Sequence, residues 1–222
     1  MEEESKKRKR PSGAIRDKER TKDKMVQAVG KVLLKKGYAN LNASTVAKEA
    51  GVDKSLVWTY FGNLDNLVEK YISQRDFWKF TAQDSINSLL TSSTGIQKEQ
   101  ISTLLQNQFE TLLNDGVLQK IIHWEIGENK SFLRNLADER EAIGEELFKL
   151  TLPQFEGSKI NMRAITALLI GGIYYLSLHG KINGSTFCGL DVNSTKDKDL
   201  INQAIEDILF WAFNNVSKKT EN

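Results

Sequence analysis

The side chains best suited to chemistry lie within residues 54–60, KSLVWTY. A lysine can reach a phosphate or a guanine edge, and serine and threonine hydroxyls can hydrogen-bond to bases. Val57 and Phe61 are four residues apart and can face inward, as core residues of a short helix. The outward set is then Lys54, Ser55, Trp58, Thr59 and Tyr60, side chains that can contact a DNA major groove.

Two short helices on either side of Gly51 are expected to position these side chains. Asn42 is a good N-cap for the segment ASTVAKEA, Gly51 ends that helix, and Asp53 caps the segment KSLVWTYF. Ser44 and the free backbone N–H groups at the start of the first helix form a phosphate anchor. Taken alone, the pattern fits a plain helical hairpin with a Trp and a Tyr in its core equally well.

The flanking segments support the DNA-binding interpretation. A basic amphipathic helix is predicted from about residues 14–17 to Lys36, with Gly37 ending it. After Gly62, Asn63 is placed to cap a long helix predicted over residues 64–90.

The order of these motifs resembles the N-terminal region of TetR-family transcriptional regulators, over about residues 17–70. The motifs that carry the resemblance are Gly37-Tyr38, Ala50-Gly51-Val52, Asp53-Lys54 and Val57-Trp58-Thr59-Tyr60-Phe61. The resemblance implies DNA contacts from Lys54, Ser55, Trp58, Thr59 and Tyr60, with Ser44 on the phosphate side. It also implies a homodimer and a helical body that encloses a small-molecule pocket.

Two positions depart from the family pattern. Leu64 stands where the family usually has a phosphate-contacting lysine, and Trp58-Thr59 stands where an aromatic pair is common. The first leaves a gap in the expected phosphate contacts, and the second points to an unusual operator preference.

Composition predicts an all-α protein of about nine helices. Only two prolines interrupt 222 residues, and strand-like alternation is scarce. Later helices are predicted over 97–114, 117–127, 130–151, 159–180 and 197–217. The expected domains are a disordered basic arm (1–13), a helix-turn-helix domain (14–63) and a helical ligand-binding and dimerisation domain (64–222).

Charge and cysteine content bear on the partners and the compartment. Residues 1–70 hold 16 Lys and Arg against 10 Asp and Glu, and the rest hold 15 against 19. A basic head favours a polyanion partner, although surface scatter would give a similar imbalance. The KKRKR arm (Lys6–Arg10) can follow the DNA backbone or the minor groove, or serve only as a solubilising tail. One cysteine and no secretory signal favour the cytoplasm.

The helical body suggests a dimer interface and a pocket. The uncharged run between Arg163 and Lys181, 17 residues long, is shorter than the ~20 residues of a membrane span and predicts a buried helix. With the last helix it can form a dimer interface or an intrachain core, and the interface candidates are Gly171, Gly172, Ile205 and Ile208. The pocket candidates, which can equally be core residues, are Phe77, Trp78, Phe109, His123, Trp124, Tyr174, Tyr175 and His179.

The sequence therefore predicts a sequence-specific DNA-binding regulator, a homodimeric repressor released from a near-palindromic operator by a small molecule. The alternative is a DNA-bound architectural or interaction factor without an inducer. No nucleophile elbow, phosphate loop or HExxH motif is present, so no enzyme is expected. No cofactor is expected, and His123, Glu125 and Glu128 lack the i, i+4 spacing of a helical metal site.

Overall fold

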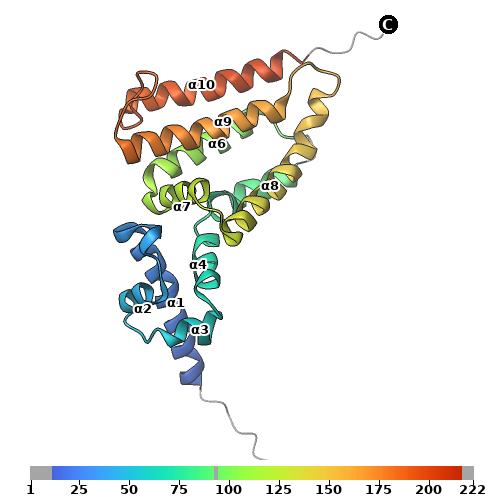
Figure 1. The fold of residues 1–222 in the computed structure, drawn as a ribbon. Helices are drawn as coiled ribbons and strands as arrows, with labels where there is room; N and C mark the ends of the chain where they lie inside the picture. The colour runs from blue at the N-terminus through green and yellow to red at the C-terminus, as the bar shows by residue number, and fades with distance from the viewer. Residues whose placement is uncertain (1–11, 93–94, 217–222) are drawn as a thin grey trace, which may run out of the picture. The chain divides into compact units, whose positions relative to one another are not determined.

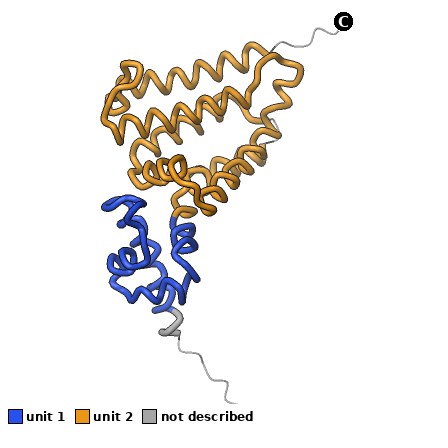
Figure 2. Tube along the Cα trace, in the orientation of Figure 1, with its two compact units in different colours: residues 1–71 blue, residues 72–222 orange. Residues whose placement is uncertain are grey.

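A computed structural model describes residues 12–92 and 95–216 of the chain. These residues form an all-α protein, as predicted, and the only β-type pairing among them is an isolated bridge between Phe187 and Leu190. The chain divides into two compact units, residues 1–71 and residues 72–222 (Figure 2). Each unit has its own buried core and is described separately.

The described part of the first unit contains four α-helices and one 3-10 turn (Figure 1). They are α1 (Ser12–Lys36), η1 (Tyr38–Asn40), α2 (Ala43–Ala50), α3 (Ser55–Phe61) and α4 (Leu64–Ser73), of which the last crosses into the second unit. The predicted apolar stripe of α1 is confirmed, because Met25, Val29, Val32 and Leu33 are buried. Gly37 ends α1 with a positive φ of 72°, and Leu67, Val68 and Tyr71 of α4 complete the core.

Gly30 allows α1 and α4 to approach each other closely. A Cβ atom built on Gly30 would lie 1.9 Å from the hydroxyl oxygen of Tyr71 and 2.3 Å from Cζ of its ring. We predict that Gly30→Ala lowers the free energy of unfolding by about 1–3 kcal/mol, the usual cost of overpacking. Gly144→Ala is the matched control, since nothing lies within 4 Å of that Cβ position in another helix. In urea unfolding, Gly144→Ala should leave the free energy of unfolding unchanged or raise it by up to about 1 kcal/mol. An equal change in both variants would contradict the close packing of Gly30 against Tyr71.

The prediction of a single helix over residues 64–90 is wrong. The chain instead forms α4, a π-helical turn η2 (Phe77–Thr81) and α5 (Gln83–Leu90). Asp76 adopts an extended conformation, and its carboxylate accepts hydrogen bonds from the backbone N–H groups of Trp78 and Lys79 at 3.0 and 3.1 Å. An aspartate that caps a new turn therefore ends the first helix, without a glycine or a proline to mark the break.

The remaining helices of the second unit agree closely with the predicted ranges. They are α6 (Lys98–Asn114), α7 (Gly116–Gly127), α8 (Ser131–Thr151), α9 (Met162–Leu178) and α10 (Thr195–Asn214), with a 3-10 turn η3 (Leu152–Phe155) and a π-helical turn η4 (His179–Asn183). Helix α6 packs against α7, α9 and α10, and α8 packs against α5 and η2 (Figure 1). Phe109, Leu105 and Ile173 are among the most deeply buried side chains of this core.

Helix α9 differs from its prediction in length and burial. With the π-helical turn, the helical segment Met162–Asn183 has 22 residues and is long and apolar enough to span a membrane by length and composition. The uncharged run of 17 residues is part of this longer segment, which also contains Arg163 and Lys181. Only 28% of its most apolar part is buried within the chain. The helix was expected to be buried on several faces, and the rest of this chain covers only part of its surface.

Candidate DNA-binding surface and ligand cavity

Helix α2 and the turn after it are fixed by local hydrogen bonds. The Asn42 side chain accepts from the Thr45 backbone N–H at 3.0 Å, and the Thr45 hydroxyl accepts from the Asn42 N–H at 3.1 Å. This reciprocal pair is a capping box. At the other end Gly51 adopts the left-handed conformation (φ 68°, ψ 38°), which favours glycine. The predicted Asn42 cap and Gly51 stop are confirmed.

Asp53 orients the start of α3. Its Oδ1 atom accepts from the Ser55 backbone N–H at 2.7 Å and from the Ser55 hydroxyl at 2.5 Å. These two hydrogen bonds lower the pKa of Asp53, so its carboxylate stays ionised at neutral pH. Helix α3 begins at Ser55, one residue later than the predicted start at Lys54, and Gly62 ends it with its N–H bonded to the Trp58 carbonyl at 3.0 Å.

The predicted DNA-contacting residues share the surface of the first unit. Val57 is fully buried and anchors α3, whereas Lys54, Ser55, Trp58 and Thr59 are exposed and Tyr60 is half-buried. Trp58 keeps 51% of its surface exposed, which is unusual for a tryptophan that has only a structural role. The exposure of the Trp58 side chain therefore excludes a plain helical hairpin with Trp58 in its core.

Hydrogen bonds within the first unit limit which DNA groups Ser55 and Thr59 can contact. The Ser55 hydroxyl already donates to Asp53, and the Thr59 hydroxyl donates to the Ser55 carbonyl at 3.1 Å. In this arrangement both oxygens remain available only as acceptors, which suits the exposed amino groups of adenine or cytosine. Tyr60 is approached by Lys18 of α1, whose Nζ lies 5.6 Å from the centre of the ring. Lys18 thus adds a positive charge beside α3.

The phosphate side of the surface is partly as expected. Ser44 is exposed in the first turn of α2, near the unpaired N–H groups of that helix end. Leu64 is half-buried at the start of α4 and offers no charge to a phosphate. The KKRKR arm lies outside the described residues.

The second unit contains a cavity of about 400 Å³ between α5, α6, α7, α8 and α9. This volume is within the ~300–1,000 Å³ range of small-molecule sites. Its wall is mostly aliphatic, with Leu89, Leu104, Leu147 and Ile170 as typical members. Four charged residues also line it, namely Glu125, Arg140, Glu141 and Arg163.

Arg140 is the centre of a buried ion-pair network at this cavity. Its Nε donates to Oδ2 of Asp76 and its Nη1 donates to Oε2 of Glu125, each at 2.6 Å. The side chains of Arg140, Asp76 and Glu125 are 9%, 1% and 22% exposed. Burial alone would lower the pKa of Arg140, but Asp76, Tyr174 and Glu125 outweigh it and raise the pKa, so the guanidinium is permanently charged.

Tyr174 and Trp78 lie beside this network. The Trp78 indole N–H donates to the Tyr174 hydroxyl oxygen at 3.4 Å, a weak bond by its length. Burial raises the pKa of Tyr174, so its phenol keeps its proton at neutral pH. The hydroxyl therefore remains a donor at the cavity wall.

The eight predicted pocket residues do not all lie at the cavity. Trp78 and Tyr174 line it, whereas Phe109 and Trp124 are buried in the core and Phe77 lines only a minor void. His123 is exposed on α7, and Tyr175 and His179 stack on each other away from the cavity wall. Arg140 and Glu125 were not predicted to line a cavity, because a charge on an amphipathic helix is usually solvated. No group of three or more potential metal ligands occurs among the described residues.

The predicted interface residues fall into two groups. Gly171, Gly172 and Ile208 are at least partly exposed, and nothing lies within 4 Å of a Cβ built on either glycine. Ile205 is only 3% exposed and belongs to the core of its own chain. Ile205 is therefore not available to a second copy and was wrongly included.

Comparison with known proteins agrees with the geometry of the first unit. Residues 30–71 match the model described as "Bacterial regulatory proteins, tetR family". No curated protein matches the chain in sequence. These residues contain the capped α2, the Gly51 turn and α3, so the class of protein is that of a helix-turn-helix DNA-binding regulator. Residues 30–71 of the chain therefore carry the DNA-binding region of TetR-family transcriptional regulators.

Solved structures extend the similarity of fold over most of the chain. FadR from Bacillus subtilis, in complex with stearoyl-CoA, is 16% identical, with a TM-score of 0.62 over 84% of this chain and 96% of that one. A TetR-family regulator from Marinobacter aquaeolei is 13% identical (TM-score 0.60, 88% and 97% covered). NalD of Pseudomonas aeruginosa, a repressor of a multidrug efflux pump, is 16% identical (TM-score 0.59, 92% and 99% covered). At these identities the likeness concerns the fold.

Proposed function

We propose that this regulator is a cytoplasmic homodimeric repressor that a small molecule releases from a near-palindromic operator. In a dimer, two α3 helices about one turn of DNA apart, roughly 34–36 Å, would read two half-sites. The observation that carries the ligand-responsive part is the 400 Å³ cavity with an apolar wall and a buried charged cluster. An architectural factor without an inducer has no need of such a cavity.

The dimer is supported by an exposed apolar surface on α9 and α10. Leu168, Gly171, Gly172 and Tyr175 follow the i, i+3, i+4, i+7 spacing of one helix face, and Leu168 is 77% exposed. On α10, Leu200, Ile208 and Trp211 are 51%, 41% and 54% exposed. Soluble monomers rarely leave so much apolar surface uncovered. We call these seven residues the α9–α10 face.

A charge on the α9–α10 face should separate the dimer. We expect Leu168→Lys to shift the chain from dimer to monomer in sedimentation at micromolar concentration, because a lysine there would be desolvated without a partner. Ile126→Lys is the matched control, since Ile126 is 72% exposed on α7 and lies outside this face. A Leu168→Lys chain that remains fully dimeric would contradict the proposed interface.

Ligand would act through the chain segment that joins the two units. Helix α4 runs from the first unit into the second and ends at Ser73, three residues before Asp76. Asp76 is held by Arg140, which lines the cavity. A ligand releases DNA only if it binds the non-binding conformation more tightly. Rearrangement of the Asp76–Arg140 pair is the step that would couple the cavity to α4.

The proposal is tested by operator release measured as fluorescence anisotropy. Stearoyl-CoA is a reasonable first probe because FadR of Bacillus subtilis binds it. Gly144→Leu, which extends a side chain into the cavity lining, should retain operator binding but lose the response to any ligand of this cavity. DNA binding without sequence preference, unchanged when the cavity is filled, would favour the architectural alternative.

A further inference from the structure

Arg140, which lines the cavity, carries a buried hydrogen-bond donor without a partner among the described residues. Arg140 uses Nε and Nη1 for Asp76 and Glu125, while its Nη2 is buried without a hydrogen-bond partner among the described residues. A buried donor left unpaired costs free energy, and native proteins rarely tolerate one without a reason. The other void that Arg140 lines measures about 10 Å³, room for a single water at most. Of these two voids beside Arg140, the larger has the space for a ligand.

A second donor lies at the same wall. The Tyr174 hydroxyl accepts from Trp78, and no acceptor for its own proton occurs among the described residues. Tyr174 and Arg140 both line the larger cavity. Two donors beside an aliphatic wall define a site for one acceptor oxygen on an otherwise apolar molecule.

The charges at this wall determine which acceptor fits. Arg140 is already paired with two carboxylates, Asp76 and Glu125. Glu141 adds a further negative charge to the lining, and the positive Arg163 of the lining is paired with Glu145. An anionic ligand would therefore bring like charges together in a poorly solvated space. A cationic ligand would meet the Arg140 guanidinium and offer no acceptor to Nη2. An uncharged carbonyl or hydroxyl oxygen satisfies both donors without either cost.

We infer that the cavity binds an uncharged, largely apolar molecule whose single carbonyl or hydroxyl oxygen accepts hydrogen bonds from Arg140 Nη2 and the Tyr174 hydroxyl. This inference rests on the cavity being the effector site of the proposed function. The opposite end of the cavity is lined by Arg163, whose guanidinium is paired with Glu145 and lies 4.5 Å from the Phe148 ring centre. Tyr174 lies eleven positions after Arg163 on α9, a rise of about 16 Å along the helix axis, which gives the approximate length of the site.

Affinities of matched probes for the full-length chain test the ligand class. By isothermal titration calorimetry, 2-undecanone should bind at least about tenfold more tightly than undecanoate or undecylamine, because the three share an apolar chain and differ in the charge of the polar end. Tighter binding of undecanoate or undecylamine would overturn the inference. So would the absence of 2-undecanone binding by a chain that still binds DNA.

Two conservative variants test the two donors. Tyr174→Phe should weaken the binding of 2-undecanone by about 3- to 10-fold, the value of one hydrogen bond, while Tyr38→Phe in η1 of the first unit should leave this binding unchanged. Arg140→Lys keeps a cation for Asp76 but removes Nη2, and it should also weaken the binding of 2-undecanone. The control is Arg134→Lys, at an exposed arginine, which should leave this binding unchanged. Affinity unchanged in both Tyr174→Phe and Arg140→Lys would overturn the assignment.

Operator release distinguishes this inference from the proposed function. Binding of 2-undecanone that depends on Tyr174 and Arg140 but leaves operator affinity unchanged supports the ligand class and contradicts ligand-responsive repression. Operator release by undecanoate or undecylamine, without 2-undecanone binding, supports repression and overturns the ligand class.

Discussion

Replacing Lys54 and Tyr60 together with alanine is expected to weaken operator binding by at least about 100-fold. Each base or phosphate contact in a major groove contributes about 1–3 kcal/mol, and both side chains are accessible, Lys54 at the N-cap of α3 and Tyr60 within the helix. Neither side chain belongs to the buried core, since Val57 anchors the helix. The dimer should therefore remain folded, and the remaining affinity should approach that for unrelated DNA.

Titration of a labelled operator at several salt concentrations measures this effect. The slope of log affinity against log salt should fall by about one when Lys54 no longer neutralises a phosphate. Lys31→Ala on α1 is the control, because Lys31 is exposed in the same unit but lies outside α3. Retained operator affinity in the double variant, with the dimer intact, would remove α3 from the DNA-binding surface.

Replacing Arg140 with alanine is expected to lower the free energy of unfolding by about 3–5 kcal/mol. The change leaves Asp76, only 1% exposed, and Glu125 without their cation inside the second unit. The free-energy cost of burying an unpaired carboxylate is larger than the loss of its hydrogen bonds alone. The cap that starts the η2 turn would be weakened at the same time, because Asp76 supplies it.

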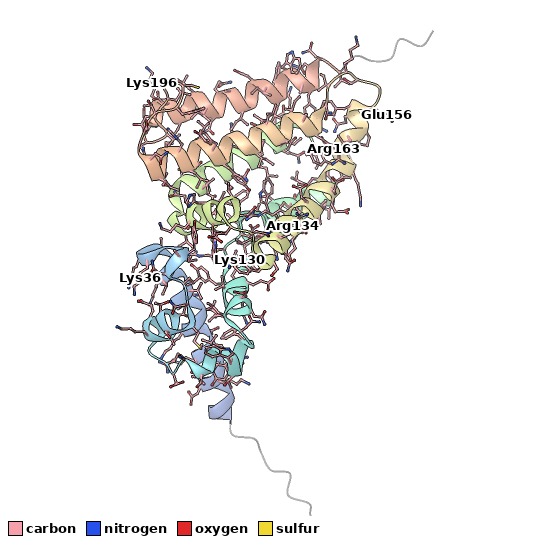
Figure 3. All side chains as sticks on the ribbon, in the orientation of Figure 1. Lys36, Lys130, Arg134, Glu156, Arg163 and Lys196 are labelled. Atoms are coloured by element: carbon pink, nitrogen blue, oxygen red, sulfur yellow. The ribbon has the colours of Figure 1, made fainter. Side chains whose placement is uncertain are left out.

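Arg163 provides a comparison, since it also donates two hydrogen bonds to carboxylate oxygens, in this case both of Glu145. Arg163 and Glu145 are about half exposed, at 46% and 50%, so Arg163→Ala should lower the stability far less than Arg140→Ala. Figure 3 labels Arg163 near the start of α9. Urea unfolding at one fixed protein concentration compares the two variants. Equal losses would show that the burial of Arg140 has no special energetic role.

The first unit could be predicted from sequence because its signals are local. Asn42, Gly51 and Asp53 act on backbone groups within a few residues, so the residue types alone indicate where α2 ends and α3 begins. The outward position of Trp58 likewise follows from helical spacing once Val57 is assigned to the core. The capping partner Thr45 and the donor use of Ser55 and Thr59 required coordinates.

The second unit was harder because its determinants are distant in sequence. Asp76 and Arg140 are 64 residues apart, yet their pairing stabilises the turn that divides the predicted helix 64–90. Neither residue type signals such a break by itself. Aromatic side chains were equally ambiguous, since Trp78 and Tyr174 line the cavity while Phe109 and Trp124 lie in the core. Their helical spacing is the same in both roles.

Selection of binding sites from random double-stranded DNA tests the central claim most directly. The full-length chain should enrich a near-palindromic sequence with half-site centres about 10 base pairs apart or a multiple of that spacing. The Lys54→Ala/Tyr60→Ala chain, selected in parallel, should enrich none. Enrichment of no sequence by the unaltered chain, or of a single asymmetric site, would contradict a homodimer that reads DNA with two α3 helices.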